Sequence, residues 1–180
     1  MSILETERLV LTRLTEEDTG FLVELLNQPS FLQFIGDKGV RCDADALRYL
    51  QDGPDAMYQR YGFCLYRVAL KETDTVIGMC GLLKREQLPD PDLGFAFLTA
   101  YEGKGYATEA ARAVLNLGFN ELGLARIVAI ANSDNAGSHR LLKKIGLCYQ
   151  GERKIYDDEA ALAMFVIERP AIEKPAIDKH

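Results

Sequence analysis

Alternating and continuous apolar runs predict the strands of this chain. Residues 8–14 alternate between polar and apolar side chains, which predicts a half-buried first strand. Two apolar runs at 63–70 and 76–83 are joined by a short polar turn, so they predict a β-hairpin. The runs at 93–98 and 127–131 are apolar throughout, which is typical of strands covered on both faces.

Apolar residues at helical spacing predict the helices. Thr15, which three acidic residues follow, is a suitable N-cap for a first helix that ends before Pro29. Further helices are expected at 43–50, 108–122 and 135–145. The helix at 108–122 connects two continuously apolar strands, so these elements predict one βαβ unit with a parallel pair of strands.

Two closing strands, at 148–154 and 161–168, complete the predicted domain. The order of elements predicts a mixed α/β domain whose central sheet is mostly antiparallel, with a single parallel βαβ step. It is not doubly wound, because strand and helix alternate clearly only once. We expect one domain at 1–168 and a polar C-terminal tail at 169–180.

Composition narrows the class of protein. The chain has 180 residues and a net charge of −6, which argues against broad nucleic-acid binding because that requires a basic face. The longest apolar run, 160–167, is too short to span a membrane, and Glu5 and Glu7 at the N-terminus do not fit a signal peptide. We therefore expect a cytoplasmic protein. Its four cysteines have no CxxC spacing and it has two histidines, so no metal site is expected.

The most informative segment is a glycine-containing turn at 101–110, between a predicted strand and the central helix. Gly103 and Gly105 permit positive φ and close approach of a ligand to the backbone. The N–H groups of the first helical turn and the helix dipole then make a site suited to phosphate. The alternative is a tight turn without a ligand. A dinucleotide fingerprint fits poorly, because Thr108 replaces its third glycine, and a Walker A motif is absent.

At this point the sequence resembles the GNAT superfamily of N-acetyltransferases, and most closely the branch that includes ribosomal-protein N-terminal acetyltransferases. The resemblance covers nearly the whole chain, from the opening LETERLVL at 4–11 through VIG at 76–78. It includes LGF at 93–95 and GKGYATEA at 103–110. The following segment also matches, at Asn132, Asn135, Ser138, Leu141, Lys144, Gly146 and Leu147.

The resemblance implies a fold and a cofactor, acetyl-CoA. It implies a V-shaped splay between the strands at 93–98 and 127–131, where the pantetheine arm pairs like an added strand with the backbone of Phe97, Leu98 and Thr99. Asn135 and Ser138 would also contact the cofactor. In the family, the motif that binds the pyrophosphate begins with Arg or Gln. Here that position is Glu102, so we expect side chains to contribute less to pyrophosphate binding. The cofactor's phosphates would lie on the turn residues Gly103, Lys104, Gly105, Tyr106, Ala107 and Thr108.

Acetyl transfer to an amine needs a proton acceptor and stabilisation of the leaving thiolate. Asp92, just before the predicted strand at 93–98, is the expected general base. The alternative is that Asp92 is only a turn residue. Glu86 in the same loop is a second candidate for the base. The resemblance implies that Ser138 protonates the thiolate, although it could equally cap the helix or bind the cofactor. Tyr149 is an alternative acid, whereas His139 is expected to be a surface residue.

The expected function is transfer of acetyl from acetyl-CoA to a primary amine, on a protein N-terminus or a small molecule, by direct attack in a ternary complex. We expect segments 28–42 and 84–92 to determine which amine is accepted. Their acidic residues would suit a cationic amine if they converge in the fold. No nucleic-acid or membrane partner is expected, and the chain would be a monomer or homodimer. Two alternatives stay open: a non-catalytic acyl-CoA sensor or degenerate family member, and a nucleotide-binding protein of another class.

Overall fold

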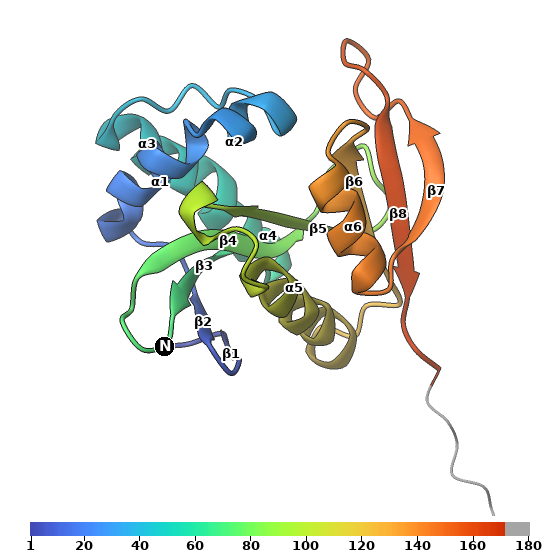
Figure 1. Cartoon of the computed structure of the whole chain (residues 1–180), viewed down its shortest axis with the longest axis horizontal. Coiled ribbons are helices and arrows are strands. Elements are labelled where there is room, and N and C mark those ends of the chain that lie inside the picture. Colours follow the sequence, from blue (N-terminus) through green and yellow to red (C-terminus); the bar gives the residue numbers. More distant parts are fainter. Residues whose placement is uncertain (172–180) are drawn as a thin grey trace, which may run out of the picture.

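The protein is built on one eight-stranded sheet in the order β1-β2-β3-β4-β5-β6-β8-β7 (Figure 1). A computed structural model describes residues 1–171; the predicted tail at 169–180 lies largely outside them. Every neighbouring pair of strands is antiparallel except β5 and β6, so the predicted single parallel step is confirmed. The strands are β1 (Leu4–Glu5), β2 (Leu9–Thr12), β3 (Leu65–Leu70), β4 (Val76–Leu83), β5 (Asp92–Phe97), β6 (Arg126–Asn132), β7 (Cys148–Arg153) and β8 (Leu162–Glu168).

Helices cover both faces of this sheet. Figure 1 shows α1, α2 and α3 on one side of β3 to β5 and α5 on the other. Two apolar cores result: Leu22, Leu25 and Leu50 pack with Met79 of β4 on the first side. Val114 of α5 packs with Ile77 and Phe165 on the second. The helices are α1 (Thr19–Leu26), α2 (Pro29–Phe34), α3 (Asp43–Leu50), α4 (Ala56–Tyr61), α5 (Tyr106–Asn116) and α6 (Ala136–Lys144).

Two helices differ from the sequence expectation because of prolines. The first helix ends before Pro29 as expected, at Leu26, but Pro29 also begins an unexpected helix, α2, where its missing N–H costs nothing. Pro54 lies inside a π-helical turn, Gln51–Asp55, that joins α3 to α4, so the chain stays helical beyond the predicted end at Leu50. A second π-helical turn, Leu117–Glu121, ends the central helix.

The start of the chain is tied to the start of α5. The Glu109 carboxylate accepts hydrogen bonds from Thr6 Oγ1 at 2.6 Å and from Arg8 N at 2.9 Å, and it pairs with Arg8 Nε at 2.7 Å. Arg8 Nη1 also donates to the carbonyl of Lys104, 3.0 Å away. Partial burial would raise the pKa of Glu109, but these contacts outweigh it and lower the pKa, so Glu109 is anionic and anchors the helix.

A matched pair of glycines tests how tightly β4 is packed. A Cβ on Gly81 would lie 1.9 Å from the carbonyl oxygen of Cys64, the residue just before β3. A Cβ on Gly20 in α1 would meet nothing within 4 Å. We expect Gly81→Ala to lower the free energy of unfolding by about 3 kcal/mol. Gly20→Ala should raise it by roughly 0.5 kcal/mol, because alanine favours the helix. Urea denaturation of both variants measures this; equal effects would contradict the packing described.

Candidate active site

The sheet divides between β5 and β6. The two strands share one registered pair, Asp92 with Val128, where Val128 N–H donates to the carbonyl of Pro91 at 3.0 Å. No further pair of residues joins the two strands beyond it. Residues 94–96 and 130–132 are consequently only half-buried, although both strands are interior to the sheet. Beyond this pair the facing backbone edges of β5 and β6 are not joined to each other, and the region between these two edges is called the groove below.

Alternation along β5 fixes which backbone groups face that groove. Leu98 N–H donates to Ile77 O of the β4 side at 2.9 Å, so its neighbour Phe97, and also Phe95, direct N–H and C=O toward β6. Thr99 N–H donates to Oε1 of Gln28, 2.8 Å away. Of the three residues expected to pair with pantetheine, only Phe97 therefore presents free backbone groups; the N–H groups of Leu98 and Thr99 already have partners.

The glycine turn has the geometry that an anion site requires. Gly103 and Gly105 have φ values of 74° and 82°, and Gly105 is the N-cap of α5. Within the described residues, the N–H groups of Gly103 to Thr108 make no hydrogen bond to the protein, as the first turn of a helix dictates. The exposed turn thus gathers all six expected phosphate-contacting residues, and its free donors and positive helix end fit a pyrophosphate.

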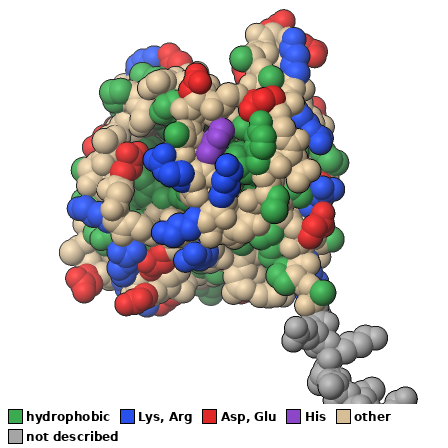
Figure 2. Space-filling view, turned by 45° about the vertical axis from the view of Figure 1, so that its right-hand side comes forward, with side chains coloured by type: hydrophobic (Ala, Val, Ile, Leu, Met, Phe, Trp, Pro, Cys, Tyr) green, Lys and Arg blue, Asp and Glu red, His purple; other side chains and the backbone are tan. Residues whose placement is uncertain are grey.

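Basic side chains gather on the face of the molecule that carries α6. Figure 2 shows Lys and Arg side chains gathered around the single histidine drawn, which belongs to α6. Lys104 lies with its ammonium 5.7 Å from the ring centroid of Tyr101, beside the turn. The exposed Glu102 makes no ion pair within residues 1–171. A group of Lys and Arg side chains therefore lies on this face of a chain whose net charge is −6.

The first turn of α6 lies beyond β6, on the other wall of the groove. Asn135 caps this helix by accepting a hydrogen bond from Ser138 N–H at 3.2 Å, and the Ser138 side chain is half-buried. His139 differs from the expected surface residue: it is half-buried, Nε2 lies 3.0 Å from the carbonyl of Asn132, and its ring meets Phe165 edge-on. Its ring therefore supports the end of β6.

Tyr149 lies two strands away from β6, and its ring packs against that of Phe165. It is an exposed residue of β7, the outermost strand, and its hydroxyl donates to Glu152 at 3.0 Å. That hydrogen bond raises the pKa of Tyr149, so the phenol holds its proton more firmly than usual. The geometry does not favour Tyr149 as the acid that the sequence left as an alternative.

Asp92 occupies the point where the sheet divides. It is the first residue of β5 and only 1% exposed, so it belongs to the sheet and not to the preceding turn. Both carboxylate oxygens lie near Arg85 Nε, at 3.2 and 3.1 Å, and Arg85 Nη1 donates to Tyr156 Oη at 2.9 Å. Burial raises the pKa of Asp92, although Arg85 opposes that effect. No local sequence signal joins Arg85 and Tyr156 to Asp92, because they come from separate loops.

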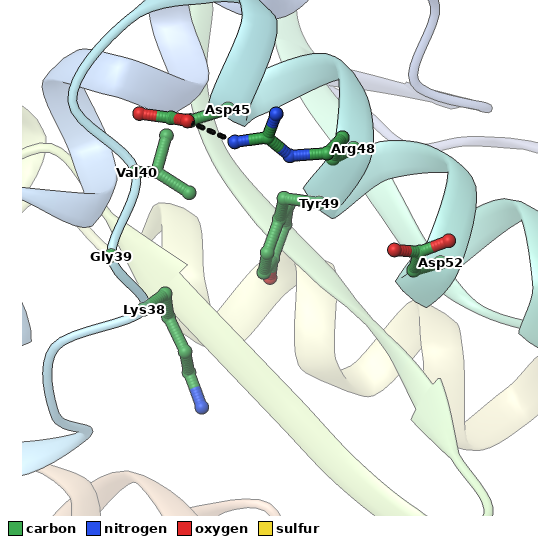
Figure 3. A pocket seen from close by; sticks show the side chains of 7 residues that line it. All are labelled: Lys38, Gly39, Val40, Asp45, Arg48, Tyr49 and Asp52. Carbon is green, nitrogen blue, oxygen red and sulfur yellow. Dashed lines mark hydrogen bonds and ion pairs between the residues drawn. The ribbon is translucent and has the colours of Figure 1, made fainter.

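The acidic residues of the acceptor segments do not converge. Asp37 pairs with Arg41 at 2.6 Å, Asp90 lies 4.0 Å from Arg126, and Glu86 is exposed. The expected acidic cluster is therefore not formed. Instead a cavity of about 230 Å³ opens beside α3, lined by Lys38, Gly39, Val40, Asp45, Arg48, Tyr49 and Asp52 (Figure 3).

Residues 1–171 contain neither a membrane-spanning helix nor a cluster of metal-binding side chains. None of their helices combines the length and apolar character that crossing a membrane requires. No three His, Cys, Asp or Glu side chains among them lie together in a way that could hold a metal ion.

Comparisons with known proteins agree with this geometry. The model of the acetyltransferase (GNAT) domain matches residues 8–147. An uncharacterized N-acetyltransferase of Bacillus subtilis, YnaD, is 29% identical over 148 residues, which cover 82% of this chain and 84% of that protein. The crystal structure of an acetyltransferase from Agrobacterium tumefaciens superposes with a TM-score of 0.77 at 25% identity, covering 92% of this chain and 93% of the other.

A Rim-type enzyme shares the fold as well. RimL, a ribosomal L7/L12 α-N-protein acetyltransferase solved in complex with coenzyme A, superposes with a TM-score of 0.76 at 15% identity, covering 93% of this chain and 98% of the other. The family match covers most of the chain, and the groove and N–H-rich turn fit the cofactor that this family uses. The chain therefore belongs to the GNAT family of acetyl-CoA-dependent N-acetyltransferases.

Proposed function

We propose that this protein transfers acetyl from acetyl-CoA to a primary amine by direct attack, with both substrates bound together. The observation that carries the proposal is the junction of the β5–β6 groove with the free N–H groups of Gly103 to Thr108. A ligand with an amide-containing arm and a pyrophosphate suits a backbone edge that continues into an anion site. The amine nitrogen bonds to the thioester carbon, the C–S bond breaks, and the thiolate takes a proton.

The groove would hold the cofactor's arm through the backbone of β5. Phe95 and Phe97 direct N–H and C=O groups toward β6, as an added strand requires. The Phe97 N–H is our proposed donor to the oxyanion that develops on the carbonyl oxygen, since a fixed N–H aimed at developing charge stabilises it. When bound, acetyl-CoA supplies the activated thioester.

We propose that Asp92 accepts the proton of the amine through a bridging water. The side chain is 1% exposed, so an amine in the groove would not touch the carboxylate directly. Its raised pKa makes it a better proton acceptor than an ordinary aspartate, while Arg85 favours its ionised form at neutral pH. The same ion pair fixes Arg85 at the narrow end of the groove.

Ser138 is our proposed acid for the departing thiolate. It lies in the first turn of α6, next to the end of β6, and its N–H is held by Asn135. No partner within residues 1–171 engages its hydroxyl, so Oγ can turn toward the groove. RimL acts on a protein N-terminus, as its name states, and a protein N-terminus or a small amine would both satisfy the chemistry proposed here.

Calorimetry and a thiol-release assay test the function together. We expect acetyl-CoA to bind the purified protein and coenzyme A thiol to accumulate steadily when a primary amine is supplied. Binding without turnover across a broad amine panel would indicate an acyl-CoA sensor. The absence of acetyl-CoA binding would overturn the proposed function altogether.

The pH dependence of kcat tests Asp92. A raised pKa means that the carboxylate is protonated below, and base-competent above, a pH higher than the ordinary aspartate value of 3.8. We therefore expect kcat to rise with pH through an acidic limb above pH 3.8, and Asp92→Asn to lower kcat by about 100-fold and remove that limb. Asp90→Asn, in the loop just before β5, is the control. An unchanged acidic limb in folded Asp92→Asn protein would exclude the base role.

Substitution of Ser138 separates an acid from a cofactor contact. We expect Ser138→Ala to lower kcat by roughly tenfold or more while the Kd of acetyl-CoA stays unchanged. Ser133→Ala is a matched control, because the Ser133 hydroxyl already donates to Glu152 at 2.5 Å. If the Kd rises and kcat does not fall, Ser138 binds the cofactor and is not the acid.

A further inference from the structure

A single guanidinium lies against one side of the glycine turn before α5. Arg8 stands just before β2, and its Nη1 group donates to the carbonyl oxygen of Lys104 at 3.0 Å. Its Nη2 group lies 3.3 Å from the point that a Cβ on Gly105 would occupy. The guanidinium carbon lies 4.4 Å from the ring centroid of Tyr106, the first residue of the helix. Arg8 therefore contacts three successive residues where the turn enters the helix.

The guanidinium is itself fixed by the first turn of α5. Arg8 Nε pairs with Oε2 of Glu109 at 2.7 Å, and the backbone N–H of Arg8 donates to Oε1 of the same carboxylate at 2.9 Å. Partial burial would raise the pKa of Glu109, but the hydrogen bonds from Thr6 and Arg8 lower it, so the carboxylate is ionised at neutral pH. The forked guanidinium thus joins a carboxylate to a backbone carbonyl.

The contact with the Lys104 carbonyl fixes the orientation of one peptide group in the turn. In a trans peptide the C=O and the following N–H point in opposite directions, so the Gly105 N–H points away from the guanidinium. Glycine does not hold this orientation by itself, because it takes positive and negative φ about equally readily. If this peptide turned over, the Lys104 oxygen would replace the Gly105 N–H on the open side of the turn, where it would repel a phosphate.

We propose that Arg8 is a positioning residue for the cofactor: by holding the Lys104 carbonyl, it keeps the Gly105 N–H directed at the pyrophosphate. This inference rests on the proposed placement of acetyl-CoA on the turn, and it adds a residue that precedes Lys104 by 96 positions. Glu102 at the start of the turn supplies no positive charge. The pyrophosphate therefore depends on backbone donors, which Arg8 keeps aligned.

Three forms of the cofactor show whether Arg8 acts on pyrophosphate binding. Arg8→Met keeps the apolar stem and removes the fork, and we expect it to raise the Kd of coenzyme A roughly tenfold in calorimetry. Dephospho-coenzyme A, which keeps the pyrophosphate and lacks the 3′-phosphate, should lose affinity by the same factor. In the thiol-release assay, kcat at saturating acetyl-CoA should stay unchanged. The kcat/KM for acetyl-pantetheine, which has no pyrophosphate, should stay unchanged as well.

Arg13→Met is the matched control for the loss of an arginine. Arg13 also forms an ion pair, with Asp55, and its guanidinium carbon lies 4.2 Å from the ring centroid of Tyr58. These contacts resemble those of Arg8 in kind, but their partners lie in or beside α4 and not in the turn. We expect Arg13→Met to leave the Kd of coenzyme A unchanged.

Two further variants separate the carbonyl contact from the neutralisation of Glu109. Arg8→Lys keeps the charge but lacks the fork, so its Kd for coenzyme A should also rise, and it carries the test if Arg8→Met does not fold. The double variant Arg8→Met/Glu109→Gln removes the carboxylate that Arg8→Met leaves unpaired. Its Kd should stay raised, because nothing holds the Lys104 carbonyl. Circular dichroism and thermal unfolding show whether each variant is folded at the assay temperature.

The outcomes separate this inference from the proposed function. If coenzyme A does not bind the unchanged protein, both fail. If it binds but no amine is acetylated, the transfer fails, and the Kd values for coenzyme A and dephospho-coenzyme A still decide the role of Arg8. An unchanged Kd in folded Arg8→Met protein overturns the inference. An equal loss with acetyl-pantetheine, no loss with dephospho-coenzyme A, or a Kd restored in the double variant would overturn it too.

Discussion

The structure depends on one constraint, the single registered pair between the parallel strands β5 and β6. A parallel ladder that continued past Asp92 and Val128 would bury both strand edges and leave no groove. Because it stops there, backbone groups in the middle of an eight-stranded sheet are free to receive a ligand. One apolar core, which includes Val114 of α5, joins both halves of the sheet, and the ion pair between Asp92 and Arg85 lies where the halves meet.

The distribution of charge is also related to the separation of β5 from β6. The positive end of α5 comes from backbone dipoles that the net charge of −6 does not include. Arg8, which lies against this turn, is neutralised by Glu109 and serves mainly to position it. On the other face, Asp37 pairs with Arg41 and Asp45 pairs with Arg48.

Local pattern predicted most of the fold, and distance along the chain explains what it missed. Strands such as β4 and the central helix follow from apolar spacing and from glycine chemistry, as do the glycine turn before α5 and the cap at Asn135. Helices α2 and α4 were missed because Pro29 and Pro54 are tolerated at a helix start and in a π-helical turn. Arg85 and Tyr156 are 71 positions apart, as are Gln28 and Thr99, and no single-sequence pattern indicates such pairs.

The anchoring of Glu109 by Arg8 also has a consequence for how the protein folds. These residues are 101 positions apart, so the contact closes a loop of more than half the chain. Loop closure of that length is slow and entropically unfavourable, and it follows the formation of local hairpins and helices. We therefore expect the glycine turn to be completed late in folding, when the N-terminal segment docks on α5. Ligand-binding competence reports the closure of the whole domain and not the folding of the turn itself.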